Sequence, residues 1–436
     1  MSGLLPRELI NHVLEEADLY RKTRQWLQGH ALSGRIHVIA IGKGAISMAA
    51  AAEDELGPNI VSGIAVVPRG TPGRLRLIPV IESSHPLPSE ASLEAARRVI
   101  SLLERISEGD TVLFLISGGG SALLELPVEG VSLDDLRRLN DLLIRSGATI
   151  SEINAVRKHV SIVKGGQLAR LVMKRGGRII SLLASDVPGD DPATIASGPT
   201  VPDPTTYGDA VASLRRSGVW DDVPPSIKRV LEEGERGLRE ETPKELAGAI
   251  NVVVASNMDV LRGTAEWLGK RGHQSIILTS RLEGEAREVG RFLASIALDS
   301  VRRGVPLGRG VILVGGEPTV TVVGNGVGGR TTEMCTGFAL SVRGVDGVSL
   351  LALATDGLDG NMGAAGCIAD GGTINEARAH GIDAVEELRR NNTAAIYEAT
   401  GSLIKTGLTG SNLNIVAAVI ISGAPNSDNA GNQVMS

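Results

Sequence analysis

The chain has 436 residues, of which 42% are hydrophobic and 22% are charged, and its formal net charge is −6 at pH 7. This length predicts two domains, and the composition is that of an ordinary globular protein. The negative charge, together with only three Trp, three Tyr and three Phe, argues against a nucleic-acid-binding protein, which needs basic surface and aromatic rings. The two cysteines, Cys335 and Cys367, provide neither a disulfide framework nor a zinc motif.

The sequence pattern gives no sign of export or of membrane insertion. Residues 1–22 lack the basic and apolar segments of a signal peptide. No apolar run reaches the ~18 residues that a membrane span requires. We therefore expect a cytoplasmic protein without membrane contact.

The first half of the chain predicts alternating strands and helices. Strands are expected where short apolar runs end near glycine, serine or proline, at residues 35–41, 63–67, 79–81, 111–116 and 178–183. Helices are expected at residues 6–28, 45–56, 89–107, 132–146 and 151–174. The alternation predicts βαβ units around a parallel sheet, because the strands are apolar throughout, as strands covered on both faces should be.

The second half repeats this pattern after a Pro- and Gly-rich stretch in which residues 226–248 are charged and expected to be helical. Strands are expected at residues 251–255, 275–279, 310–314 and 348–354, with 319–323 as a hairpin partner, and helices at 257–271 and 284–303. We therefore predict an α/β fold of two domains, each with a mainly parallel sheet flanked by helices. The expected boundary gives a Rossmann-like domain over residues 1–240 and a second α/β domain over residues 241–436.

Candidate functional residues gather where the predicted strands end, which is where open parallel sheets bind ligands. Gly42-Lys43-Gly44 follows the first strand, so Lys43 can reach an anion at the start of the next helix. Ser117-Gly118-Gly119-Gly120-Ser121 follows a later strand, and its consecutive N–H groups can cradle a phosphate. A solvated lysine and an ordinary glycine turn are the alternatives, and the P-loop pattern GxxxxGK[ST] is absent.

One helix and two loops of the first half carry further candidates. Asn154, Arg157 and Lys158 are spaced to share one helical face, which suits a carboxylate or a phosphate, although a solvated basic face explains them equally well. Acids after residues 178–183 can hold Mg²⁺ or its waters, or can close turns. This group consists of Asp186 and Asp190, followed by Ser197 and Gly198. His85, between Ser84 and Pro86, fits either a substrate-binding or a structural role.

The second half offers two more groups of candidates. Glu317 follows a glycine pair, and Arg330 ends a glycine-rich run. The guanidinium fork of Arg330 can clamp a phosphate or a carboxylate, and the alternative is a hairpin tip with a solvated arginine. Asp356 and Asp359 share a strand-end loop and suit a general base or a metal site.

Taken together, these motifs resemble those of the glycerate 2-kinase family, whose second half is known as the MOFRL domain. The resemblance covers nearly the whole chain and rests on an ordered set: Gly42-Lys43-Gly44, Ser84-His85-Pro86, Ser117 to Ser121, Asn154-x-x-Arg157-Lys158-His159, Ser185-Asp186-Val187, Ser197-Gly198-Pro199-Thr200, Gly315-Gly316-Glu317, Gly328-Gly329-Arg330, Thr355-Asp356-Gly357-x-Asp359-Gly360 and Thr409-Gly410-x-Asn412.

The resemblance implies two α/β domains with the active site in the cleft between them. It also implies that ATP and Mg²⁺ phosphorylate the 2-hydroxyl of D-glycerate, giving 2-phospho-D-glycerate. The expected catalytic residues are then Lys43, Arg330 and Asp356. The nucleotide is expected at the turn Ser117, Gly118, Gly119, Gly120 and Ser121, with Asp186, Asp190, Ser197, Gly198 and Glu317. The substrate is expected at His85, Asn154, Arg157 and Lys158, and the metal at Asp186 and Asp359.

Two positions depart from the family pattern, and two other functions stay open. An Asn-Gln pair commonly follows the arginine, where this chain has Thr331-Thr332, and another acid often follows Asp359, where this chain has Asn361. An NAD(P)-dependent hydroxypyruvate reductase is one alternative, because Gly42-x-Gly44 is close to a dinucleotide motif. A non-catalytic sugar-phosphate-binding module is the other, although no DNA-binding helix accompanies it. A homodimer, the metal ligands and the choice between glycerate and a related hydroxy acid stay open as well.

Overall fold

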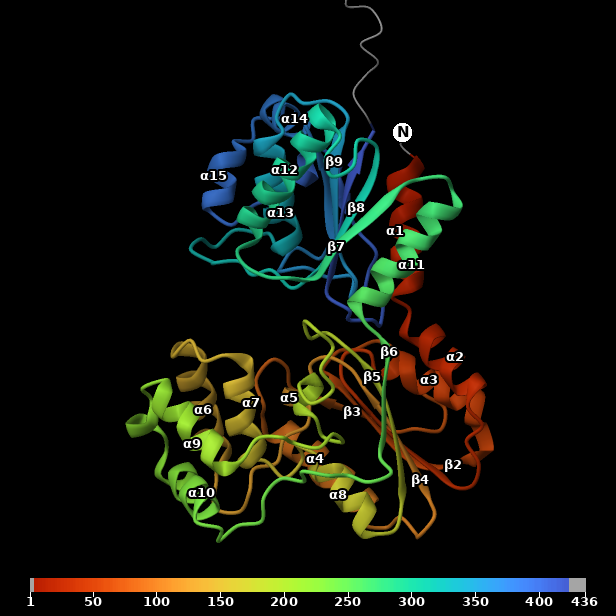
Figure 1. Ribbon diagram of the computed structural model, residues 1–436, viewed down its shortest axis with the longest axis vertical. Helices are drawn as coiled ribbons and strands as arrows, with labels where there is room; N and C mark the ends of the chain where they lie inside the picture. The colour runs from red at the N-terminus through yellow and green to blue at the C-terminus, as the bar shows by residue number, and fades with distance from the viewer. Residues whose placement is uncertain (1–3, 423–436) are drawn as a thin grey trace, which may run out of the picture. The chain divides into compact units, whose positions relative to one another are not determined.

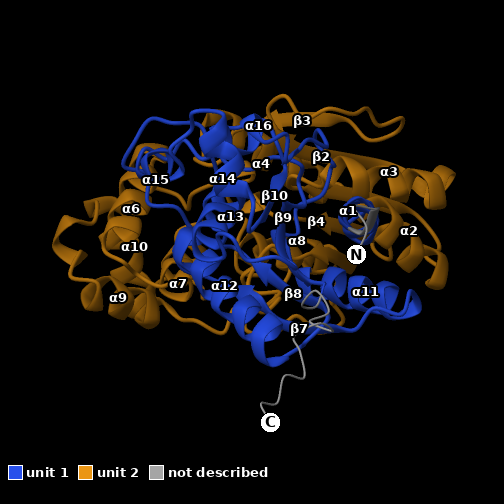
Figure 2. Ribbon diagram, turned by 90° about the horizontal axis from the view of Figure 1, so that it is seen from above, with its two compact units in different colours: residues 1–18, 257–436 blue, residues 19–256 orange. Residues whose placement is uncertain are grey.

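The structure, a computed structural model, describes residues 4–422 of the chain. It consists of two compact units, which Figure 2 colours separately. Unit 2 comprises residues 19–256, and unit 1 comprises residues 1–18 together with residues 257–436. No helix in the described part of the chain is long and apolar enough to cross a membrane.

Unit 2 is built on a six-stranded parallel sheet with the strand order β3-β2-β1-β4-β5-β6 (Figure 1). Its strands are β1 (Ile36–Ile41), β2 (Ile60–Pro68), β3 (Val80–Ser83), β4 (Thr111–Ile116), β5 (Arg178–Ala184) and β6 (Ile250–Ala255). Its α-helices are α2 (Leu19–Gly29), α3 (Ala45–Leu56), α4 (Glu90–Leu103), α5 (Gly120–Leu123), α6 (Leu133–Arg145), α7 (Ile150–His159), α8 (Gln167–Lys174), α9 (Tyr207–Arg216) and α10 (Pro225–Glu235). Its 3₁₀ helices are η1 (Gly57–Asn59), η2 (Ile195–Ser197) and η3 (Trp220–Asp222). This is a Rossmann-like order, which reverses between β1 and β4.

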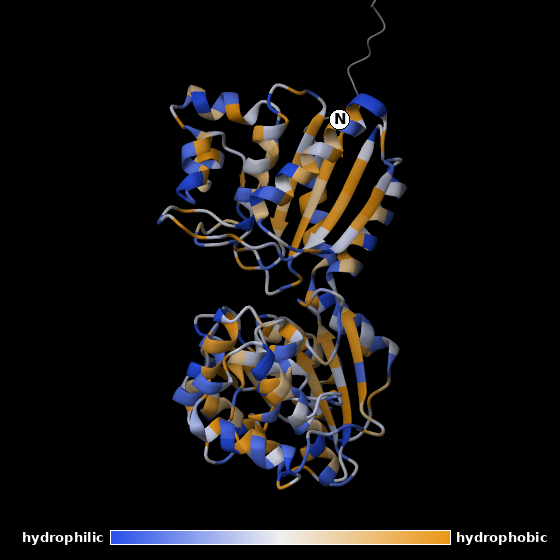
Figure 3. Ribbon diagram, turned by 60° about the vertical axis from the view of Figure 1, so that its left-hand side comes forward, coloured by the Kyte–Doolittle hydropathy of each residue, from blue (hydrophilic) through white to orange (hydrophobic). Residues whose placement is uncertain are grey.

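Apolar strands form the core of unit 2. Every residue of β1 and β4 is buried, and Figure 3 shows hydrophobic residues along the strands of both units. Helices α4 and α8 bury their apolar residues in one cluster with Ile39 and Phe114. Helices α6, α7, α9 and α10 pack around a separate cluster of their own, so this part of unit 2 is a helical layer beside the sheet.

Two predicted helices of unit 2 are shorter in the structure. The helix expected over residues 151–174 is divided into α7, which ends at His159, and α8, which begins at Gln167. Gly165 and Gly166, directly before α8, have φ angles of 54° and 79°, a left-handed conformation that a right-handed helix does not continue through. The charged stretch over residues 226–248 is helical only as far as Glu235. A glycine with positive φ lies in each interruption, directly before α8 and, at Gly237 with a φ of 74°, shortly after the end of α10.

Unit 1 contains a six-stranded mixed sheet with the order β11-β10-β9-β12-β8-β7. Its strands are β7 (Ser275–Leu282), β8 (Gly310–Gly316), β9 (Val348–Ala354), β10 (Gly366–Asp370), β11 (Leu403–Ile404) and β12 (Ile415–Ile421). Its helices are α1 (Leu4–Glu16), α11 (Asn257–Lys270), α12 (Ala286–Arg303), α13 (Arg330–Ser341), α14 (Thr373–Ala379), α15 (Ala384–Arg389) and α16 (Ala394–Ala399). Figure 1 shows α12 and α13 on one face of this sheet and α1 and α11 on the other.

The predicted α/β class and the two sheets are confirmed, but the strand pairing of unit 1 differs from the prediction. Among the described strands of this unit, only β7 and β8 pair in parallel, and the other pairs are antiparallel. The strand β12, which the sequence analysis did not assign, lies between β8 and β9 and runs antiparallel to both. Residues 319–323 form no hairpin strand, because Thr319 makes a single bridge to Glu285 instead.

The division into units also differs from the predicted boundary at residue 240. Strand β6 pairs with β5 and completes the sheet of unit 2, so the division falls after residue 256. The first predicted helix is two helices that serve different units. In α1 the ring of His12 stacks on Trp267 of α11 with 4.8 Å between ring centroids, whereas in α2 Arg24 pairs with Glu55 of α3. A stretch that the periodicity predicted to be one amphipathic helix therefore forms two helices, one packed in each unit.

Candidate active site

The first group of predicted residues lies where the sheet of unit 2 reverses its strand order, after β1 and β4. The last residues of these strands are paired in register, so the two loops that follow begin side by side. The N–H of Lys43 donates to the carbonyl of Gly118 at 2.9 Å, and the N–H of Gly44 donates to Oγ of Ser117 at 2.9 Å. A methyl group on Gly42 would overlap the hydroxyl of Ser117. The two motifs therefore form one structure, which requires glycine at position 42.

The glycine turn brings Lys43 and His85 together. Gly119 has a φ of 85°, and a methyl group there would lie 3.0 Å from Cδ2 of His85 and 3.6 Å from Cγ of Lys43. Desolvation lowers the pKa of His85, and the positive charge of Lys43 lowers that pKa further. The imidazole is therefore held in its neutral form beside Lys43, where it can donate or accept a hydrogen bond.

A chain of side-chain hydrogen bonds joins the end of the glycine turn to α7. The hydroxyl oxygens of Ser121 and Ser197 are 2.7 Å apart, and Oγ of Ser197 donates to Oδ1 of Asn154 at 3.0 Å. Ser197 and Gly198 lie in a left-handed turn with φ angles of 60° and 61°, a conformation that is uncommon for serine and is often found at functional sites. The structure thus brings together predicted residues from three separate segments of unit 2.

Arg157 and Lys158, which the sequence placed on one functional face, lie in different surroundings. Nζ of Lys158 forms a buried ion pair with Asp203 at 3.2 Å. Asp203 therefore already compensates the charge of Lys158, and the contact of Lys158 with substrate stays a prediction. Arg157 instead lies within the electrostatic influence of Glu125. All three candidates lie on α7 as predicted, but Arg157 and Lys158 have different tertiary partners.

The sequence analysis missed two buried charged residues beside this group. Nζ of Lys164 pairs with Oε2 of Glu125 at 2.9 Å and also donates to the carbonyls of Ser121 at 2.9 Å and Leu124 at 3.2 Å. The available signal was the glycine pair that follows Lys164 inside a predicted helix, since such glycines indicate a break or a close backbone approach.

Asp186 and Asp190 follow β5, the parallel neighbour of β4, and therefore lie at the same edge of the sheet as the glycine turn. Asp190 has a φ of 58°. The next acid, Asp191, closes the loop by accepting from the N–H of Ala193 at 3.1 Å and the hydroxyl of Thr194 at 2.7 Å. Nucleotide or metal binding by Asp186 and Asp190 stays a prediction.

In unit 1 the ends of β8 and β9 meet the start of β12. Ile415 is paired with both Gly316 and Ala354. Glu317 and the loop over residues 355–360 directly follow these paired residues. Because β8 and β9 both run antiparallel to β12, they are parallel to each other and end at one edge of the sheet. The second group of predicted residues gathers at this edge.

Arg330 is the first residue of α13, and two carboxylates hold its guanidinium. Nη1 pairs with Oε1 of Glu317 at 2.8 Å, and Nε pairs with Oδ1 of Asp359 at 3.3 Å. Burial alone would lower the pKa of Arg330, but Asp359 and Glu317 raise that pKa above its ordinary value. Three predicted residues therefore form one ion-paired cluster around a fully charged guanidinium.

The carboxylate of Asp359 is engaged on both oxygens. Oδ2 accepts from the N–H and from the hydroxyl of Thr331, both at 2.6 Å, while Oδ1 pairs with Arg330. Oγ1 of Thr332 accepts from the N–H of Gly329 at 3.0 Å and caps α13. The two threonines at the position of the family's Asn-Gln pair thus hold Asp359 and the start of the helix. Asp359 positions Arg330, and this arrangement does not favour its predicted role as a metal ligand.

Asp356 lies in the loop after β9. Its Oδ1 accepts from the N–H of Leu358 at 3.1 Å, and its carbonyl accepts from the N–H of Thr409 at 3.2 Å. Residues 4–422 contain no group of three or more His, Cys, Asp and Glu side chains that could hold a metal ion. Mg²⁺ needs only one or two protein carboxylates when phosphate oxygens complete its coordination, so the metal ligands stay a prediction.

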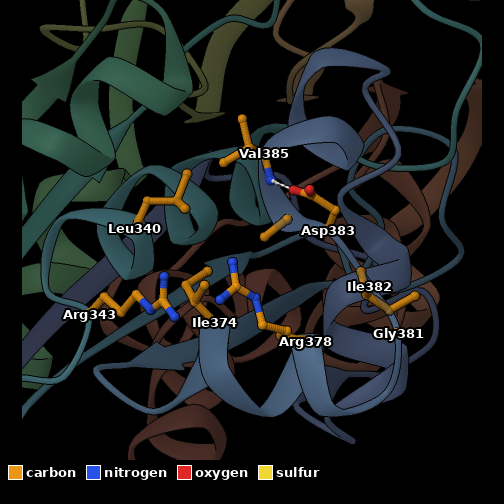
Figure 4. A pocket seen from close by; sticks show the side chains of 9 residues that line it. Leu340, Arg343, Ile374, Arg378, Gly381, Ile382, Asp383 and Val385 are labelled. Carbon is orange, nitrogen blue, oxygen red and sulfur yellow. Dashed lines mark hydrogen bonds between the residues drawn. The ribbon is translucent and has the colours of Figure 1, made fainter.

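Two surface pockets of the described residues lie apart from these groups. One, of about 550 Å³, is lined by residues of β1 to β3 and α4. The other, of about 270 Å³, lies in unit 1 near the end of α13, and Figure 4 shows Arg343 and Arg378 on either side of Ile374. Asp383 in this pocket caps α15 by accepting from the N–H of Val385 at 3.0 Å. The predicted site residues line neither pocket.

Comparison with known proteins identifies families and solved structures that this chain is similar to. Residues 2–232 match DUF4147, described as a domain of unknown function, and residues 310–415 match the MOFRL family. A glycerate 2-kinase of Pyrococcus horikoshii is 44% identical over 89% of this chain and 88% of its own length. A protein of Agrobacterium vitis that is provisionally named hydroxypyruvate reductase is 42% identical over 89% of this chain and 87% of its own length. The crystal structure of a glycerate kinase from Thermotoga maritima matches with a TM-score of 0.88 and 37% identity, over 96% of this chain and 100% of that chain.

Proposed function

The chain belongs to the glycerate kinase family, and from that premise we propose that it transfers the γ-phosphate of ATP to the 2-hydroxyl of D-glycerate, giving 2-phospho-D-glycerate and ADP. The observation that carries this proposal is the joined pair of loops around Lys43 and Ser117–Ser121, at the strand-order reversal of a Rossmann-like sheet. Open α/β sheets bind nucleotides at that point. A lysine beside a row of backbone N–H groups suits the phosphates of a nucleotide.

The role of unit 2 is to hold and neutralise phosphate. Phosphoryl transfer depends on positioning and on charge neutralisation rather than on covalent chemistry by the protein. In the proposal the N–H groups of Gly118, Gly119 and Gly120 hold the phosphates of ATP, and Lys43 neutralises charge on the transferred group. The absence of a side chain at Gly119 supports this, because a methyl group there would crowd the space beside His85 and Lys43.

A nucleotide substrate brings Mg²⁺, which supplies positive charge to the phosphate oxygens. Asp186 and Asp190 fit this ion because they follow β5 at the edge of the sheet that carries the glycine turn. Two carboxylates with phosphate oxygens and waters make a sufficient set of ligands. We therefore keep Asp186 of the predicted metal pair, and we assign Asp190, which was predicted to bind the nucleotide, to the metal in place of Asp359.

The role of unit 1 is to supply a second fixed cation and a group for the attacking hydroxyl. In the proposal Arg330 stabilises charge during the transfer, and Asp356 orients or deprotonates the 2-hydroxyl of the substrate. Glu317 and Asp359 keep the guanidinium of Arg330 in place. In the proposal residues of each unit contribute to the reaction, so a change at Lys43 or at Arg330 should lower turnover.

The reaction is tested with purified protein, D-glycerate, ATP and Mg²⁺, using enolase alone to consume the product. Enolase accepts 2-phosphoglycerate, so a signal without added mutase supports both the kinase reaction and the 2-position. Release of ADP without an enolase signal would contradict the 2-position or the substrate. No release of ADP would contradict the kinase reaction itself.

Replacing Lys43 tests the observation that carries the proposal. We expect Lys43→Ala to lower kcat by about 100-fold or more, since a preorganised charge at the transferred group contributes on that scale, while the circular dichroism spectrum stays unchanged. The matched control is Lys174→Ala, which removes an exposed lysine at the end of α8 and should leave kcat unchanged. A fully active Lys43→Ala enzyme would exclude the assigned role.

A second candidate is NADPH-dependent reduction of hydroxypyruvate. The Rossmann-like strand order and the Gly42-x-Gly44 turn after β1 favour it. However, β2 ends at Pro68 and is followed by Arg69, so the acid that binds the ribose of NAD is missing and only NADPH would suit. Loss of NADPH absorbance on addition of hydroxypyruvate would support this candidate, and no loss would remove it.

A further inference from the structure

Arg157, near the end of α7, is a half-buried cation without a counter-ion among residues 4–422. Its Nε is buried and has no hydrogen-bond partner, and its guanidinium forms no ion pair with any carboxylate of residues 4–422. Burial lowers the pKa of Arg157, and the negative charge of Glu125 opposes that shift without cancelling it. The guanidinium is partly desolvated and has a buried donor without an acceptor, which is unfavourable, so an anion bound at Arg157 would be favoured.

The acid beside Arg157 does not supply that anion, because other groups already occupy it. Oε2 of Glu125 pairs with Nζ of Lys164 at 2.9 Å. Oε1 accepts from the hydroxyl of Ser161 at 2.6 Å and from the N–H of Leu126 at 3.0 Å. Lys164 and Glu125 neutralise each other, so the positive charge of Arg157 stays uncompensated.

This uncompensated charge lies one helical turn from a polar network that reaches the glycine turn. Asn154 lies one helical turn before Arg157 on α7. Asn154 is joined through Ser197 to Ser121, the last residue of the turn. Nζ of Lys164 donates to the carbonyl of that same serine at 2.9 Å. The amide of Asn154 is therefore connected to the end of the turn that the proposed function assigns to ATP, and the guanidinium of Arg157 lies one helical turn further along α7.

We propose that Arg157 and Asn154 bind the carboxylate of the phosphoryl acceptor, and that Glu125 and Lys164 are positioning residues that keep Arg157 available. This inference rests on the proposed kinase function. A planar guanidinium matches a carboxylate with two parallel hydrogen bonds, whereas the phosphates of ATP already have the N–H groups of the turn and Lys43. Lys164 acts by occupying Glu125, which would otherwise be able to pair with Arg157.

The first test is the steady-state kinetics of Arg157→Gln in the full-length protein. The KM for D-glycerate should rise about 10- to 100-fold, the scale of a charge-assisted hydrogen bond, while the KM for ATP stays close to that of the wild type. The matched control is Arg145→Gln, which removes an exposed arginine paired with Asp141 at the end of α6. Both KM values should be unchanged in this control.

The second test asks whether Lys164 keeps Glu125 away from Arg157 or only supports the fold. Lys164→Met removes the charge and keeps the length of the side chain, so Glu125 becomes free to pair with Arg157 and the KM for D-glycerate rises. In the double variant Lys164→Met with Glu125→Gln, no acid is left to compete, and the KM should return toward the wild-type value. A structural role alone predicts that the second substitution adds damage rather than rescue.

Several outcomes would overturn the inference. In Arg157→Gln, a higher KM for ATP with an unchanged KM for D-glycerate would assign the residue to the nucleotide, and two unchanged constants would make its role structural. If Arg157→Gln does not fold, Arg157→Lys keeps the charge without the fork and should raise the KM for D-glycerate less. Wild-type enzyme that phosphorylates glyceramide as well as D-glycerate would also contradict the inference. Wild-type enzyme that phosphorylates neither would contradict the proposed function instead.

Discussion

Arg157 in unit 2 and Arg330 in unit 1 present two different states of the same side chain. Arg330 is paired with Glu317 and Asp359, whereas Arg157 pairs with no carboxylate in the described part of the chain and has an unpartnered Nε. Arg330 is therefore held in position with its charge balanced, and Arg157 is held with its charge unbalanced. A charge that is already balanced contributes mainly when new negative charge develops in the transition state. An unbalanced charge instead stabilises the bound anion in the ground state. The comparison predicts a defect in kcat at Arg330 and a defect in KM at Arg157.

The largest expected effect comes from removing Arg330. We expect Arg330→Ala to lower kcat by about 10²- to 10³-fold, as for other preorganised transition-state groups, with little change in the KM for D-glycerate. Arg330→Lys should recover little, because lysine lacks the planar fork that contacts both Glu317 and Asp359. Steady-state kinetics measures both variants. If the Arg330 variants change only the KM for D-glycerate, Arg330 binds substrate as Arg157 is proposed to do, and the predicted difference between the two arginines is wrong.

The next effect tests the groups that hold Arg330 in position. Asp359→Asn removes the charge that accepts from both groups of Thr331 and pairs with Arg330. We expect the free energy of unfolding to fall by about 1–3 kcal/mol, the range for a buried charge-assisted hydrogen bond, and kcat to fall with it. The control is Asp299→Asn, an exposed acid that pairs with Arg303 on α12.

Urea unfolding followed by circular dichroism measures the stability of both variants. The control should change the free energy of unfolding by no more than about 0.5 kcal/mol, as surface substitutions usually do. Asp359→Asn with normal stability but reduced kcat would mean that Asp359 acts on the reaction rather than through the position of Arg330.

Much of this arrangement could be predicted from sequence because it depends on local patterns. Apolar runs that end in glycine correctly placed the loops at Gly42 and Ser117, since only glycine permits their close approach. The strand order of unit 1 was not predictable in this way. Strand β12 is an apolar run like its neighbours, and its position between β8 and β9 depends on tertiary pairing.

The different fates of Arg157 and Lys158 show the same limit within the site. Neighbouring residues on a helix point about 100° apart, so only one of the two can face a given partner. The partner of Lys158 is Asp203, which lies 45 residues further along the chain, and nothing local indicates this contact. The Glu125–Lys164 pair was missed for the same reason, although the glycines after Lys164 hinted at a special backbone.

A smaller effect is expected from alanine substitutions in unit 2, which distinguish the cost of backbone strain from the loss of nucleotide contact at the glycine turn. Gly119 and Gly109 have nearly equal φ angles, 85° and 83°, but a methyl group at Gly109 would contact nothing within 4 Å, whereas one at Gly119 would lie 3.0 Å from His85. Alanine at either position should cost about 1–2 kcal/mol of stability from the left-handed conformation. Only Gly119→Ala should also raise the KM for ATP. Equal kinetics for the two variants would mean that the turn does not hold the nucleotide.

The smallest expected effect is a change in the pKa of His85, which reports the positive charge of Lys43 beside it. Desolvation and the charge of Lys43 both lower the pKa of His85, so its folded-state pKa lies below the unfolded value of about 6.5. The stability that this residue contributes is therefore complete above pH ~6.5 and is lost as the pH falls through the folded-state pKa. Lys43→Met should raise the pKa of His85 in an NMR titration without restoring the ordinary value, because desolvation remains. If the pKa of His85 does not move in Lys43→Met, the two side chains are not close enough to share one site. The positive charge that unit 2 offers to a bound anion would then have to come from Arg157.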